Sequence, residues 1–104
     1  DQIELIESKA FYGLESNLNS LVLSYNRLNS ISFNLSLLIN LNDLKINNNA
    51  LESIQNHTFK NLTKLKCLNL NSNNLKRIEQ GSFDHLISLI NLNLGKNELK
   101  ECNK

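Results

Sequence analysis

The sequence predicts an α/β-type repeat solenoid, in which about four short parallel β-strands form a concave face and the convex side is irregular or 3₁₀-helical. Three observations predict this fold class: apolar residues recur with a period of 24, each period contains a Leu-x-Leu pair or its equivalent, and an asparagine follows each pair. At 104 residues the chain is at most one small domain. Single periods of this length cannot bury their apolar faces alone, so they are expected to stack.

The period is clearest in two stretches of the second half of the chain. LNDLKINNNALESIQNHTF ends at Phe59 and LKCLNLNSNNLKRIEQGSF ends at Phe83, 24 residues later (83 − 59 = 24). An earlier repeat is one residue shorter, and the lost residue falls between Ile31 and Leu35. The prediction is therefore a single array over 1–104, made of a partial repeat (1–17), a short repeat (18–40), two full repeats (41–64 and 65–88) and a second partial repeat (89–104).

Each part of a repeat has a physical role. The Leu-x-Leu alternation indicates a short strand with one buried face, because successive side chains of a strand point to opposite sides. The asparagine after the strand indicates a turn, since its short amide can bond to local backbone groups. These asparagines are predicted to form a structural ladder that satisfies backbone groups between coils. They are Asn26, Asn49, Asn73 and Asn97.

The pattern L-x-x-L-x-L-x-x-N-x-L-x-x-I-x-x-x-x-F-x-x-L, which covers nearly the whole chain, resembles the leucine-rich repeat. It is similar to the 24-residue class common in extracellular receptors such as Toll-like receptors, Slit proteins and variable lymphocyte receptors. Phe11, Phe59 and Phe83 match the interior Phe column of that class, and Leu35 is placed in this column in the short repeat. Neither end shows the cysteine clusters that cap such solenoids, so the resemblance implies a fragment without complete caps.

Composition and motifs argue against several function classes. The formal net charge is +1, which does not indicate a nucleic-acid partner, and no apolar run approaches the roughly 18 residues of a transmembrane helix. His57 and His85 lie four positions out of register, so they do not predict a metal pair. No serine has the setting of a catalytic nucleophile. We therefore expect no enzyme activity, no catalytic residues, no metal and no cofactor.

Cysteines and glycosylation sequons leave alternatives open. Cys67 is expected to point outward from its strand and Cys102 inward, which disfavours a disulfide between them. Cys102 is then either a buried thiol or the beginning of a C-terminal cap. Three N-x-S/T sequons fall on the convex side, where glycans would leave the strand face clear, although an Asn-rich composition also produces such sequons by accident. They begin at Asn34, Asn56 and Asn61.

The outward positions of the strands are the candidate binding surface. Tyr and Arg are favoured at binding hot spots, so Val22, Tyr25 and Arg27, with Asp43 and Lys45 beside them, are the best anchors. The rest of the candidate face is the set of asparagines Asn47, Asn69, Asn71 and Asn93. An ordinary solvated strand face is the competing interpretation.

By resemblance, the predicted function is non-catalytic protein recognition. The chain would be part of an extracellular receptor ectodomain or secreted recognition protein in innate immunity or cell adhesion. Its partner would be another protein, for example a microbial or cell-surface ligand, bound on the concave face. The alternatives are a cytoplasmic scaffold of the same fold and a structural spacer.

Overall fold

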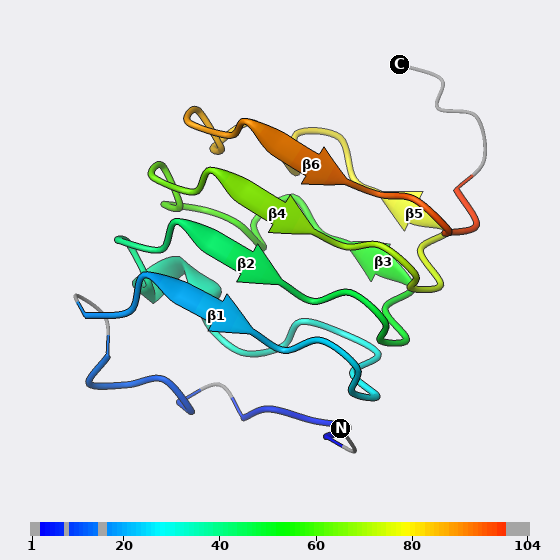
Figure 1. The fold of residues 1–104 in the computed structure, drawn as a ribbon, viewed down its shortest axis with the longest axis horizontal. Coiled ribbons are helices and arrows are strands. Elements are labelled where there is room, and N and C mark those ends of the chain that lie inside the picture. Colours follow the sequence, from blue (N-terminus) through cyan, green and yellow to red (C-terminus); the bar gives the residue numbers. More distant parts are fainter. Residues whose placement is uncertain (1–2, 8, 15–16, 100–104) are drawn as a thin grey trace.

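The computed structural model describes residues 3–7, 9–14 and 17–99 and has the predicted architecture (Figure 1). Four three-residue strands form one parallel sheet in the order β1-β2-β4-β6. Their bounds are Ser20–Val22 for β1, Asp43–Lys45 for β2, Cys67–Asn69 for β4 and Asn91–Asn93 for β6. Each coil adds one strand, so the leucine-repeat solenoid fold class is confirmed.

The register of the sheet follows the sequence repeat. Leu44 pairs with Leu21 on one side and with Leu68 on the other, which is one repeat in each direction. The central residue of β2 and β4 is buried and the residues on either side of it are more exposed, as the period-2 alternation requires. Backbone hydrogen bonds continue the ladder beyond the strands, for example from the Leu23 N–H to the Lys45 carbonyl (2.7 Å).

The interior between the strands and the convex side is filled by aliphatic and Phe side chains. Phe59 is fully buried, and its ring stacks on Phe83 with 6.0 Å between centroids. In the short repeat Leu35 holds the Phe-column position, as predicted: it is buried, and its carbonyl accepts from the Leu38 N–H (2.9 Å) as that of Phe59 accepts from the Leu62 N–H (3.2 Å). Phe33 adds a ring two residues earlier, in edge contact with Phe11 at 5.6 Å. The sequence did not predict this additional interior ring.

The repeat asparagines lie between coils and bond to backbone groups of both. The side-chain amide of Asn73 donates to the carbonyl of Leu70 in its own coil (3.1 Å) and of Ile46 in the preceding coil (3.0 Å). Its Oδ1 accepts from the Leu51 N–H (3.1 Å). Asn49 makes the equivalent bonds one coil earlier. These amides satisfy groups that would otherwise be buried without partners.

The convex side contains more regular structure than the sequence predicted. A 3₁₀-helix, η1, spans Leu35–Leu37, in agreement with the prediction. A second, two-stranded parallel sheet pairs β3 (Ser53–Ile54) with β5 (Arg77–Ile78) and was not predicted. In the described part of the chain the short repeat has no strand to match β3, so this flanking sheet ends at the boundary between the short repeat and the next coil.

Cys67 is a free thiol at the start of β4, half-buried on the outward side as predicted. Cys102, with its predicted inward position, lies outside the described residues. Across the described residues no helix is long and apolar enough to cross a membrane.

Candidate interaction surface

Figure 1 shows β1, β2, β4 and β6 side by side in one sheet. We call the surface made by their outward side chains and by the turns that follow these strands the strand face. Val22 and Lys45 are register partners on neighbouring strands, and both are exposed, Val22 by 57%. Asn69 and Asn93 continue the same row on β4 and β6. The structure thus brings candidate residues from four repeats, distant in sequence, onto one surface.

Most of the asparagines on this surface are already engaged in hydrogen bonds. Asn47 Oδ1 accepts from the Ser24 hydroxyl (2.5 Å), and Asn47 Nδ2 donates to Asn48 Oδ1 (2.8 Å). Asn93 Oδ1 accepts from Asn71 Nδ2 (3.2 Å). Asn69 Oδ1 likewise accepts from the Asn71 N–H (3.0 Å). A partner would have to compete with these bonds, so the asparagines contribute shape more than affinity.

Tyr25 stands in a turn that forces its side chain outward. Its φ is 60°, in the left-handed region that bulky residues rarely adopt, and its side chain is 62% exposed. Asn48 and Ser72 have the same conformation in the next two coils. The Tyr25 N–H donates to the Asn47 carbonyl (3.0 Å), so the ladder between coils holds the strained residue in place. The backbone that carries this exposed ring is therefore held in place, and an exposed Tyr is a suitable anchor for a partner.

Arg27 lies near Tyr25 and is also exposed. Its guanidinium approaches the carboxylate of Glu4 at 3.8 Å, and both side chains are more than half exposed. An ion pair of this kind contributes at most about 1 kcal/mol. Arg27 therefore remains available to a partner that offers a carboxylate in better geometry.

Asp43 has an oxygen without a protein partner. In the described part of the chain, Oδ1 of Asp43 is buried and accepts no hydrogen bond. The side chain borders a hollow of about 460 Å³ on the strand face, together with Lys45, Cys67 and Asn91. Because this oxygen is buried, a donor that enters the hollow does not reach it unless the Asp43 side chain turns. The repeat pattern predicts Asp43 as an outward residue, but nothing in the sequence signals this unpaired oxygen.

The sequons and histidines lie away from the strand face. Asn34 precedes η1, and Asn56 and Asn61 lie in the turns after β3, where all three are exposed. His57 and His85 are also exposed on this side. No group of three or more His, Cys, Asp or Glu side chains in the described ranges is arranged to hold a metal ion.

Comparison with known proteins gives a family and related structures. The sequence profile described as "Leucine rich repeat" matches residues 39–99, more than half of the chain. The leucine-rich repeat domain of APL1B aligns with a TM-score of 0.81 and 28% identity over 98% of this chain. TLR13, in its complex with ssRNA13, aligns with a TM-score of 0.55 and 23% identity over 98% of this chain, which supports the fold alone.

This chain spans 30% of the APL1B chain and 21% of the TLR13 chain. No curated protein sequence matches it. The profile covers two full repeats with the same period as the observed coils. On this basis, the chain belongs to the leucine-rich repeat family.

Proposed function

We propose that this chain is part of a non-catalytic recognition module that binds a protein partner on its strand face, outside the cell or at the cell surface. The observation that carries the proposal is the group of anchors at the β1 end of this face. Val22 and Tyr25 expose more than half of their surface there, with Arg27 and Lys45 beside them. Isolated exposed apolar residues are ordinary, but Tyr25 and Arg27 are of the residue types enriched at binding hot spots, and they lie together here.

The charges on this surface favour a protein with acidic groups. Arg27 and Lys45 are exposed and provide positive charge. A partner carboxylate near Arg27 and Lys45 would complement this arrangement. The same partner would also contact the asparagines that lie beside these anchors on the strand face, which are Asn47, Asn69, Asn71 and Asn93.

An extracellular setting, in innate immunity or cell adhesion, is supported by the likeness to the APL1B domain and by the three exposed sequons. The sequons Asn34, Asn56 and Asn61 lie on the convex side, so glycans there would leave the strand face open. A cytoplasmic scaffold is the alternative, and the free thiol of Cys67 is compatible with it.

The proposal is tested by photo-crosslinking from matched positions. Tyr25 and Tyr12 are replaced, one at a time, by p-benzoylphenylalanine. Tyr12 is a matched control because it is 54% exposed, close to the 62% of Tyr25, and lies outside the strand face. The variants are irradiated in extracellular fluid or with cell membranes from the native source, and the adducts are identified by mass spectrometry.

We expect a defined protein adduct from position 25 that is absent from position 12. Adding Arg27→Ala to the position 25 variant should reduce its yield about threefold or more, since removing a hot-spot side chain typically costs at least 1 kcal/mol of binding. Equal adducts from both positions, or none from position 25, would contradict the proposal and favour a structural spacer that binds no partner on this face.

A further inference from the structure

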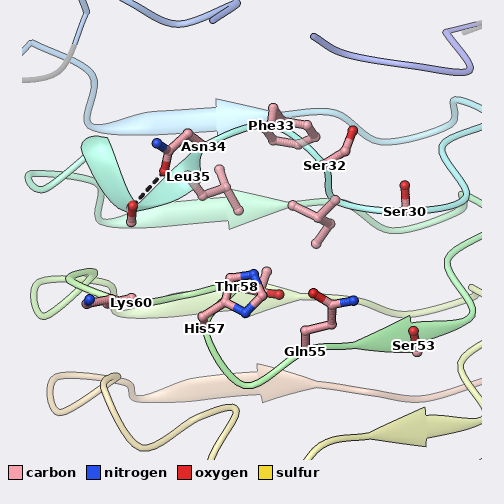
Figure 2. A pocket seen from close by; sticks show the side chains of 12 residues that line it. Ser30, Ser32, Phe33, Asn34, Leu35, Ser53, Gln55, His57, Thr58 and Lys60 are labelled. Carbon is pink, nitrogen blue, oxygen red and sulfur yellow. Dashed lines mark hydrogen bonds between the residues drawn. The ribbon is translucent and has the colours of Figure 1, made fainter. Parts of the chain in front are cut away.

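A groove of about 610 Å³ opens on the convex flank between the short repeat and the coil that follows it. Figure 2 shows its two sides, one formed by residues 30–36 and the other by residues 53–60. We call it the flank groove. It lies outside the strand face and takes no part in the function proposed above. Its volume is in the range of sites that hold small ligands or short peptide segments.

The groove exists because two neighbouring coils are not joined on this flank. One coil further on, β3 pairs with β5, and the Lys76 N–H donates to the Glu52 carbonyl (2.9 Å). Between 29–36 and 53–60 no hydrogen bond is found in the described structure. The sequence offers a cause, since the short repeat lacks one residue between Ile31 and Leu35 and turns early into η1.

The missing pairing leaves one edge of β3 open. The Ile54 carbonyl accepts from the Glu79 N–H (2.9 Å), so Ile54 faces β5. Because successive residues of a strand direct their backbone groups to opposite sides, Ser53 and Gln55 direct their N–H groups toward the flank groove. The Gln55 carbonyl is used by the Thr58 N–H (3.2 Å), but neither of these two N–H groups donates to the facing segment of the short repeat. This edge is a template for one more strand.

The side chains around the edge are polar and favour negative charge. Hydroxyl groups line the groove from both sides, including Ser30, Ser32 and Thr58. Lys60 and His57 are exposed at one end, and the twelve lining residues include no carboxylate. Phe33 and Leu35 provide an apolar base. A segment that entered here would meet backbone donors, hydroxyls and one fixed positive charge.

We propose that the flank groove binds an extended acidic peptide segment, which pairs with the open edge of β3 and adds a strand to the flanking sheet. Backbone hydrogen bonds to Ser53 and Gln55 provide affinity in this mode, and the side chains provide selection. Alternate side chains of the peptide point toward Phe33 and Leu35 and toward solvent. An acidic residue of the peptide lies near Lys60.

The test uses the acetylated, amidated peptide Val-Asp-Val-Glu-Val-Asp-Val and the whole chain. The protein is produced without glycans, because Asn34 lines the groove and a glycan there would cover its opening. One matched peptide carries N-methyl groups at alternate bonds, which removes pairing but keeps the side chains. A second matched peptide replaces each acidic residue by lysine. Binding is measured by fluorescence anisotropy, and hydrogen exchange is measured at individual backbone amides.

The expected result is slower exchange at Ser53 and Gln55, by about tenfold or more at saturating peptide, with little change at Ile54. N-methylation should weaken binding about tenfold or more, the loss expected from one or two backbone hydrogen bonds. Lys60→Glu should weaken it about threefold or more, whereas Lys76→Glu, the same charge change on an exposed lysine outside the groove, should stay within about twofold.

Several results would overturn the proposal. The N-methylated or the lysine peptide could bind as tightly as the parent, which would exclude strand pairing or charge selection. Unchanged exchange at Ser53 and Gln55 with bound peptide would place it elsewhere. Protection of these amides by an oligosaccharide or inorganic phosphate, but not by the peptide, would assign the groove to another ligand. Absence of any binding at millimolar peptide would also refute it.

Discussion

Replacing Asn73 by alanine should lower the free energy of unfolding by about 1–3 kcal/mol, the cost of leaving a buried polar group without a partner. The side chain is 5% exposed and joins two coils through Leu51, Leu70 and Ile46. Alanine leaves the Leu51 N–H without its acceptor, whereas the Ile46 and Leu70 carbonyls lose one of their donors and keep the bonds from Asn49 (3.2 Å) and Asn97 (3.0 Å). Urea denaturation followed by circular dichroism measures the loss.

Asn74→Ala is the matched control for this substitution. Asn74 is the exposed neighbour of Asn73, and its side chain makes no hydrogen bond in the described structure. Its replacement should change the free energy of unfolding by less than about 0.5 kcal/mol. If both alanine variants unfold at the same urea concentration, the bonds between coils do not hold the solenoid together as described.

Replacing Phe59 by alanine should cost about 3–5 kcal/mol, the range found when a buried Phe is truncated. Phe59 is fully buried and stacks on Phe83 at a centroid distance of 6.0 Å, so alanine leaves a cavity and removes the ring contact between two coils. Thermal and urea unfolding of the variant measure the effect. In a small array the loss should unfold neighbouring coils together, because each coil is stabilised mainly by its neighbours.

Phe59→Leu separates packing from a general intolerance to change at this position. Leucine keeps much of the buried volume, so this variant should lose clearly less stability than the alanine variant, by at least about 1 kcal/mol. Equal losses from leucine and alanine would contradict the cavity explanation and indicate that the ring itself, through its stack on Phe83, sets the stability.

The strand positions could be predicted from the sequence because alternation and the 24-residue period are local and repeated. Leu44 and Leu68 occupy the same place in successive repeats, and their pairing follows from that. The flanking sheet could not be predicted, because β3 and β5 have two residues each. Two residues are too few to show an alternation of apolar and polar side chains. Its pairing depends on how closely two coils approach, which is a property of the packed solenoid.

The sequence predicts which residues lie on the candidate surface, but it does not predict their hydrogen bonds or burial. Alternation identified Asn71 and Asn93 as outward residues, yet the bond between their side chains depends on rotamers in two different coils. The unpaired oxygen of Asp43 has the same origin, since it depends on neighbours on adjacent strands. Phe33 was not predicted as an interior ring because it lies two residues before the Phe column, at a position that no other repeat fills with Phe.

Extracellular recognition, as opposed to a cytoplasmic scaffold, is tested most directly by glycan mapping of the protein from its native source. Asn34, Asn56 and Asn61 are exposed and clear of the strand face, so the oligosaccharide transferase of the secretory pathway could reach them. Peptides are analysed by mass spectrometry before and after enzymatic removal of N-glycans. We predict occupancy of at least one of the three sites. Three bare sites would contradict the extracellular assignment and direct the search for partners to the cytoplasm.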